Sequence, residues 1–127
     1  MGLDPKILPQ ALTSKMNPKD RPAESELTEP QEQGRFAQWL LPRDIAEELW
    51  FDWSATHKAL TNRPGTPDFL IKLFGKPAFW IEFKSPGGRF SPAQKKTIGL
   101  LRQLGGEVFI AATADEAIEI VKRAQLT

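Results

Sequence analysis

The sequence predicts an α/β protein in which a small mixed β-sheet is flanked by helices, and two patterns lead to that expectation. Residues 69–74 and 78–83 are apolar segments separated by a Gly-Lys-Pro turn, which is typical of a β-hairpin. Residues 78–112 then read as strand, helix and strand, so the third strand should lie parallel to the second with a right-handed crossover. The length of 127 residues suits a single domain with a modest core.

The N-terminal segment differs from the rest of the chain. It contains four prolines and scattered charges without a sustained apolar period, which is typical of a flexible arm or of a segment that docks on a partner subunit. We therefore expect an arm at residues 1–27 and a folded domain at residues 28–127.

Two helical segments and an edge strand are expected before the hairpin. Thr28 is a suitable N-cap for a helix over residues 28–41, and Pro42 is expected to end that helix. Residues 43–50 form a second helical pattern, in which Glu47 and Glu48 are expected to face solvent, with the helical acid of the site as the alternative for one of them. The aromatic residues in 49–53 then predict a short edge strand.

The chain after the hairpin contains two more helix starts. Ser91 and Gln94 form a capping box at the start of a helix that a Gly-Gly pair ends. A short apolar strand follows it. Thr113 and Glu116 form a second capping box, and the last helix is expected to end near Ala124.

The residues that point most clearly to chemistry lie on the hairpin. Asp68 starts its first strand, and Glu82 and Lys84 are two residues apart on its second strand, so Glu82 and Lys84 share one face. Two carboxylates on one face attract a hard cation such as Mg²⁺, which activates a bound water and offsets charge on a phosphate oxygen. An ammonium group beside them orients that water or stabilises the developing charge.

The alternative for these residues is an exposed ion pair on an edge strand. Trp80, Ile81 and Phe83 surround Glu82, however, and a lone charge in an apolar strand is costly unless it is paired or bound to a metal. This background favours a functional site.

Positive charge is concentrated around these acids. The whole chain has a net charge of only +1, but residues 58–103 hold nine Lys or Arg against two acids, Asp68 and Glu82. A basic segment around a carboxylate pair suits a phosphodiester substrate, although each basic residue taken singly is more often a solvated surface group. The residues expected to contact nucleic acid are Arg63, Lys72, Ser85, Arg89, Lys95 and Lys96.

Several residues have both a structural and a functional interpretation. Gln94 caps its own helix, and it also lies one loop away from Lys84, where it could touch water, a metal ligand or a phosphate. Glu29 and Glu32 complement the dipole of the first helix, and either could deliver a third carboxylate to the site. Gly65, shortly before the first acid, could let the backbone approach a phosphate closely.

The composition excludes other classes of site. The chain has no Cys, so it has no disulfide and no thiolate chemistry, and the single His57, interpreted as a surface residue, excludes a His-rich zinc site. There is no apolar run long enough to span a bilayer and no signal-peptide pattern at the start. We therefore expect a cytoplasmic protein without a membrane partner.

Five segments occur in order and at fitting gaps: Glu-Pro-Gln-Glu-Gln at 29–33, Pro-Gly-Thr-Pro-Asp at 64–68, Trp-Ile-Glu-Phe-Lys at 80–84, Phe-Ser-Pro-Ala-Gln at 90–94 and Gly-Gly-Glu-Val at 105–108. Together they resemble the VRR-NUC domain, a branch of the PD-(D/E)xK nuclease superfamily, over about residues 28–122. The resemblance implies a restriction-endonuclease-like core and a metal-dependent DNA endonuclease that hydrolyses phosphodiester bonds.

The resemblance also implies roles for particular residues. Asp68, Glu82 and the backbone carbonyl of Phe83 would bind Mg²⁺ or Mn²⁺, and Lys84 would orient or activate the attacking water. The catalytic candidates on the helices are Gln94, as the family's helix glutamine, and Glu29, as its helical acid, with Glu32 as the alternative.

The resemblance further implies a kind of substrate and an assembly. Small stand-alone members of phage type are associated with homodimers that act on branched DNA, such as Holliday junctions or flaps, as in DNA repair. We expect a homodimer of this kind in a nucleoid or a phage-infected cell. A second interpretation, from another class, is a DNA-binding module or a subunit that keeps the nuclease-like fold without cutting.

Overall fold

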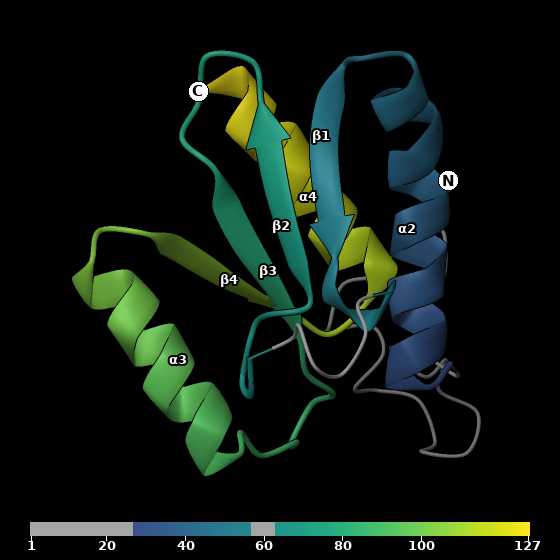
Figure 1. Ribbon diagram of the computed structural model, residues 1–127. Helices are drawn as coiled ribbons and strands as arrows, with labels where there is room; N and C mark the ends of the chain where they lie inside the picture. The colour runs from purple at the N-terminus through teal and green to yellow at the C-terminus, as the bar shows by residue number, and fades with distance from the viewer. Residues whose placement is uncertain (1–26, 57–62) are drawn as a thin grey trace, which may run out of the picture.

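A computed structural model describes residues 27–56 and 63–127 of the chain (Figure 1). The expected arm, apart from Leu27, lies outside these residues, as does His57. The elements in chain order are α2 (Glu29–Ile45), β1 (Leu49–Trp53), the 3-10 helix η2 (Ser54–Thr56), β2 (Phe69–Leu73), β3 (Phe79–Phe83), α3 (Pro92–Gln103), β4 (Glu107–Ala111) and α4 (Ala114–Leu126).

Within the described residues, the strands form a four-stranded sheet in the order β1-β2-β3-β4 (Figure 1). β1 with β2 and β2 with β3 are antiparallel, whereas β4 lies parallel to β3. This arrangement confirms the predicted hairpin, the edge strand and the parallel third strand. The fold is therefore the expected α/β type, a mixed sheet flanked by helices.

Different helices cover the two faces of the sheet. On one face, Phe69 of β2 and Phe83 of β3 are fully buried, and the ring centroid of Phe36 in α2 lies 4.8 Å and 5.8 Å from theirs. α4 completes this core, and it passes behind the sheet in Figure 1. Because side chains alternate along a strand, Glu82 points to the other face, where Gln94 of α3 contacts it.

The prediction that Pro42 ends the first helix is wrong. α2 continues through Pro42 to Ile45, so the two predicted helical pieces form one helix. Proline removes one backbone donor, which leaves the carbonyl of Gln38 without its helical partner, but both residues are exposed and water can take that place. Arg43 strengthens this turn because its Nη1 donates to the Trp39 carbonyl at 2.7 Å and its guanidinium lies 3.8 Å from the centre of the Trp39 ring.

The second half of the predicted helix over residues 43–50 is a turn into β1. Glu47 has a φ of 60°, a left-handed conformation that ends the helix and turns the chain back. Asp44 then accepts a hydrogen bond from the backbone N–H of Phe51 at 3.3 Å. This side chain therefore satisfies a donor on the outer edge of the sheet, which a neighbouring strand would otherwise pair with.

The start of α4 differs in detail from the predicted capping box. The Thr113 hydroxyl accepts from the Glu116 backbone N–H at 3.2 Å, as expected. The Glu116 carboxylate, however, accepts from the N–H of Ala112 at 2.7 Å rather than from that of Thr113. Val121 is buried against the sheet, and the helix runs to Leu126, slightly past the expected end, although Leu126 itself is exposed.

Candidate active site

The two acids of the hairpin meet at the end of the sheet where β2 begins and β3 ends. Phe69 pairs with Ile81, so extending the register by one residue sets Asp68 opposite Glu82. Asp68 Oδ2 accepts a hydrogen bond from the backbone N–H of Phe83 at 2.7 Å, which fixes its carboxylate on the neighbouring strand. The structure therefore brings the two predicted acids together.

Glu82 is the most unusual side chain of this site. It is only 1% exposed, and its Oε2 accepts a hydrogen bond from Gln94 Nε2 at 2.9 Å. Its Oε1 is buried and has no hydrogen-bond partner among the described residues. A buried oxygen of this kind is costly in a folded protein, and a bound cation is one of the few groups that relieves the cost.

Burial is the main cause that raises the pKa values of both acids. Burial raises the pKa of Glu82 from 4.5 to about 8, and the neighbouring charge of Asp68 adds to the effect. The pKa of Asp68 is also raised, chiefly by burial and partly by the charge of Glu29, against the lowering effect of its bond to Phe83. Two acids that resist ionisation side by side are suited to a positive ion between them.

Gln94 caps its helix as predicted, and it also connects the acid Glu82 to the base Lys84. Its Oε1 accepts from the Ser91 backbone N–H at 2.8 Å, which completes the predicted capping box of α3. The same oxygen accepts from Lys84 Nζ at 3.2 Å, while Nε2 donates to Glu82. One amide therefore caps the helix and sets the relative positions of Glu82 and Lys84.

Phe90 is a site residue that the sequence reasoning missed. Lys84 Nζ lies 5.1 Å from the centre of the Phe90 ring, close enough for a cation–π contact. The available signal was an aromatic side chain in an otherwise polar Gly-Pro-rich turn between β3 and α3. Such a residue is half-buried here because it packs beside the ammonium group rather than in the core.

Of the two candidate helical acids, Glu29 lies beside the site. Its Oε2 accepts from the backbone N–H of Ser85 at 3.3 Å and from the Ser85 hydroxyl at 3.4 Å. Glu32 is 1% exposed and instead accepts from the N–H of Ala114 at 2.9 Å, at the first turn of α4. Glu32 thus joins two helices, and Glu29 is the acid near Asp68.

Gly65 has a packing role in addition to the expected approach to a phosphate, which stays a prediction. Its φ is +81°, and a Cβ added there would lie 2.2 Å from the carbonyl oxygen of Ala93 at the start of α3. Thr97 of α3 also donates to the carbonyl of Pro64 at 3.1 Å. The segment leading to Asp68 is therefore pressed against α3, and only glycine fits at the contact.

Most of the predicted nucleic-acid-binding residues surround this end of the sheet. Lys95 and Lys96 are exposed in the first turn of α3, Arg89 is exposed in the turn after β3, and Arg63 is exposed just before Gly65. A helix N-terminus with added lysines is a favourable place for a phosphate.

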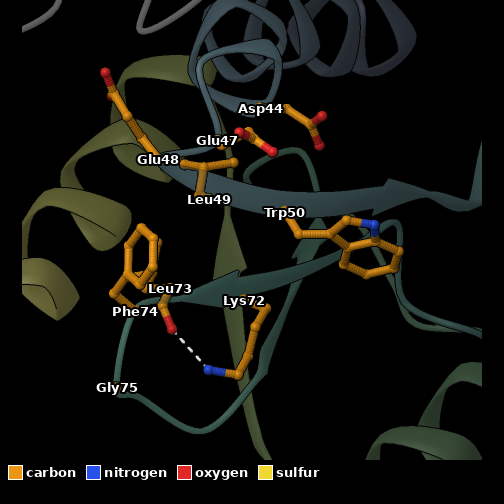
Figure 2. A pocket seen from close by; sticks show the side chains of 9 residues that line it. All are labelled: Asp44, Glu47, Glu48, Leu49, Trp50, Lys72, Leu73, Phe74 and Gly75. Carbon is orange, nitrogen blue, oxygen red and sulfur yellow. Dashed lines mark hydrogen bonds between the residues drawn. The ribbon is translucent and has the colours of Figure 1, made fainter.

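Lys72 is the exception among these residues. It lies four residues along β2 from Asp68, which corresponds to roughly 13 Å of strand. Its Nζ donates to the Leu73 carbonyl at 2.7 Å, and Figure 2 shows this bond in a pocket at the opposite end of the sheet. The structure therefore does not bring Lys72 to the acids.

That opposite pocket has the wrong charge for a DNA phosphate. Figure 2 shows acidic side chains from the end of α2 and the turn that follows it, on the same pocket as the exposed rings of Trp50 and Phe74. The lining residues are Asp44, Glu47, Glu48, Leu49, Trp50, Lys72, Leu73, Phe74 and Gly75. Three carboxylates and a single ammonium group make this pocket a poor phosphate site.

The donor set around Asp68 and Glu82 fits a hard divalent cation. The set consists of oxygen donors, and one carboxylate oxygen is buried without a partner. The residues that the structure describes contain no group of three or more His, Cys, Asp or Glu side chains placed to hold a metal. A metal here would therefore rely on two carboxylates together with a backbone oxygen and solvent or substrate oxygens.

Comparison with known proteins identifies the family to which this chain belongs. The family model of the VRR-NUC domain matches residues 17–115, which is most of the chain. No curated protein and no solved structure gives a significant match. In the described part of the chain, no helix has the length and apolar character needed to cross a membrane. With its mixed sheet of restriction-endonuclease type and the acids Asp68 and Glu82 beside Lys84, this chain belongs to the VRR-NUC family of the PD-(D/E)xK nuclease superfamily.

Proposed function

We propose that this nuclease domain is a DNA endonuclease that depends on Mg²⁺ or Mn²⁺ and hydrolyses phosphodiester bonds. Membership of a DNA-processing nuclease family supports the reaction class. The observation that carries the metal dependence is the buried, unpartnered Oε1 of Glu82 beside the Asp68 carboxylate. No other group of described residues combines acids, an ammonium group and surrounding positive charge in this way.

The proposed ligands are Asp68, Glu82 and the backbone carbonyl of Phe83. A divalent ion held by them supplies Lewis acidity toward a phosphate oxygen and lowers the pKa of a bound water. Gln94 holds Oε2 of Glu82, so Oε1 would be available to bind the ion. The bond from the Phe83 N–H keeps the Asp68 carboxylate in place on the adjacent strand.

Lys84 is the proposed electrostatic catalyst. Gln94 Oε1 and the Phe90 ring hold its ammonium group on the same face as Glu82. From there it can orient the attacking water or stabilise the charge that develops on the phosphate, which is the usual contribution of a fixed cation to such a reaction. Glu29, hydrogen-bonded to Ser85, is the proposed third acid at the edge of the site.

We further propose that the enzyme is a homodimer and that it is selective for branched DNA. Lys95, Lys96, Arg89 and Arg63 surround the acids and would bind the phosphates on either side of the cut. Two sites related by a two-fold axis match a substrate that is itself two-fold, such as a Holliday junction, and a flap is the alternative branched substrate. Such an enzyme would act on DNA in the cytoplasm of the cell or of its phage-infected form.

A cleavage panel tests the proposal. Four-way junctions, flaps and linear duplexes of the same sequence are incubated with the protein in Mg²⁺, in Mn²⁺ and in EDTA. We expect metal-dependent cutting of the branched substrates, and a loss of at least about 100-fold for Glu82→Ala, Asp68→Ala and Lys84→Ala. Glu107→Ala, at an exposed position of β4, is the matched control and should cut normally.

The panel tests the proposed metal-dependent cleavage separately from the proposed selectivity for branched DNA. Cutting that survives Glu82→Ala, or no cutting of any substrate, contradicts a metal nuclease at these residues. Equal rates on linear and branched DNA contradict only the shape selectivity. Sedimentation of the wild-type protein then shows whether the cutting species is a homodimer.

A further inference from the structure

A second cavity lies next to the candidate active site and takes no part in the proposed chemistry. It has a volume of about 260 Å³ and is formed between α3, β4 and the turn that precedes α3. Its lining residues are Phe90, Lys95, Ile98, Gly99, Arg102 and Ile110.

The cavity shares its walls with the site. Ile110 is the register partner of Glu82 in the parallel pair of β3 and β4, so the two side chains share a face about 4.8 Å apart in strand spacing. Phe90, on another wall, is the ring that lies beside Lys84 Nζ. A group bound in the cavity would therefore be a direct neighbour of the reacting phosphate.

The chemistry of the walls suits a flat ring that carries polar groups on its edge. Phe90, Ile98 and Ile110 supply apolar surface, and the lining contains two cations but no acid. The Arg102 guanidinium is held in place because its Nη2 donates to the Val108 carbonyl at 2.6 Å. The volume is below the roughly 300–1,000 Å³ of pockets that hold drug-sized ligands, which favours a single ring system over a base pair.

Gly99 provides an independent observation. It lies within α3, where glycine lowers helix stability relative to alanine. A Cβ added at this position would meet no atom within 4 Å, so internal packing does not require glycine here. The missing side chain instead leaves the cavity wall open, which is what a ligand needs.

We propose that this cavity accepts one unpaired nucleobase of the DNA substrate, next to the phosphate that is cut. The base stacks on Phe90, its polar edge faces Lys95 and Arg102, and its own phosphate lies toward the lysines of α3. The inference rests on the proposed nuclease function and deepens it. It explains a preference for branched DNA without a second subunit, because flaps and branch points present unpaired nucleotides.

The test combines a protein variant in which the cavity is filled with a DNA substrate from which one base is missing. Cleavage of a flap substrate is measured as kcat/KM, with a normal or an abasic nucleotide placed in turn at each position flanking the cut. For the wild type we expect about a tenfold loss at one position. Gly99→Leu, which fills the cavity, should show a similar loss with the normal base and little further loss with the abasic nucleotide.

Gly34→Leu is the matched control. Gly34 is also a helical glycine whose added Cβ would meet no atom within 4 Å, but it lies in α2 away from the cavity. It should keep the wild-type ratio between normal and abasic DNA. Phe90→Leu keeps apolar surface but removes the ring, and it should weaken the preference for the base in the same way as Gly99→Leu.

Binding measured on the same variants separates failure of this inference from failure of the nuclease proposal. DNA with 2-aminopurine at the sensitive position, or at each flanking position if nothing is cut, should show fluorescence quenching with wild type and Gly34→Leu but not with Gly99→Leu. Quenching without any cleavage would overturn the nuclease proposal and keep the base-binding cavity. Cleavage that is indifferent to the abasic nucleotide at every position, or equal quenching by Gly99→Leu, would overturn the cavity assignment.

Discussion

At the scale of single residues, the site depends on one amide group that makes three contacts. Gln94 accepts from Ser91 and Lys84 through Oε1 and donates to Glu82 through Nε2. Groups that orient a ligand or a catalytic side chain in this way commonly contribute 10–100-fold to metal affinity or activity, an order of magnitude that holds roughly across metal sites.

This arrangement predicts the effect of Gln94→Glu. The new carboxylate can still accept from the Ser91 N–H and cap α3, so the melting temperature should stay close to that of the wild type. It cannot donate to Glu82, and it adds a third negative charge beside the acids, so cleavage should fall by about 10–100-fold. Circular dichroism and cleavage rates measure the two effects separately. Unchanged stability together with unchanged activity would show that Gln94 only caps the helix.

At the scale of elements, the hairpin and the strand–helix–strand unit were predictable because each depends on local patterns. The two apolar segments, the Gly-Lys-Pro turn between them and the Ser91 capping box are short-range signals, and the structure confirms the elements that they predict. The length of α2 was not predictable, because the cost of Pro42 depends on whether the orphaned carbonyl is exposed. That is a property of the folded molecule and not of the segment.

The acids and the base of the candidate site were predictable from the sequence, but the contacts between the site and the surrounding helices were not. The spacing of Asp68, Glu82 and Lys84 identified the group, since a strand alternates its side chains. The choice between Glu29 and Glu32 required the packing of α2 on α4, where Glu32 accepts from the first turn of α4. The role of Gly65 likewise required the position of α3, which is distant in sequence.

The packing of Gly65 on α3 predicts a large effect of Gly65→Ala. The substitution combines a left-handed φ with a Cβ that clashes with the Ala93 carbonyl, so we expect a loss of about 2–4 kcal/mol in unfolding free energy. Gly75→Ala is the control, because Gly75 has a similar φ of +69° but open space around it. It should lose only about 1 kcal/mol in urea unfolding. Equal losses would contradict the proposed contact between the Asp68 segment and α3.

At the scale of the whole molecule, the buried acids make the metal-free protein sensitive to pH. The folded pKa of Glu82, about 8, lies above its ordinary value of 4.5, so the folded state holds a proton that the unfolded state releases between these pH values. The contribution to stability is complete below pH 4.5 and is lost as the pH rises to about 8. The raised pKa of Asp68 acts in the same direction.

Thermal unfolding in EDTA at a series of pH values tests this expectation. The melting temperature should fall between pH 5 and pH 8 by at least about 5 °C more for the wild type than for Glu82→Gln, which carries a neutral side chain of the same shape. Added Mn²⁺ should restore much of the loss at pH 8 in the wild type alone. Parallel curves for the two proteins would show that Glu82 is not a strained, buried acid.

The central claim is that Asp68 and Glu82 together hold a divalent ion. Calorimetric titration of Mn²⁺ into wild-type protein, Glu82→Gln and the exposed-site control Glu107→Gln at pH 7.5 measures it most directly. We predict binding to the wild type with release of protons, unchanged binding to Glu107→Gln, and affinity at least about 100-fold weaker in Glu82→Gln. Equal binding by wild type and Glu82→Gln, or no binding by either, would contradict the account.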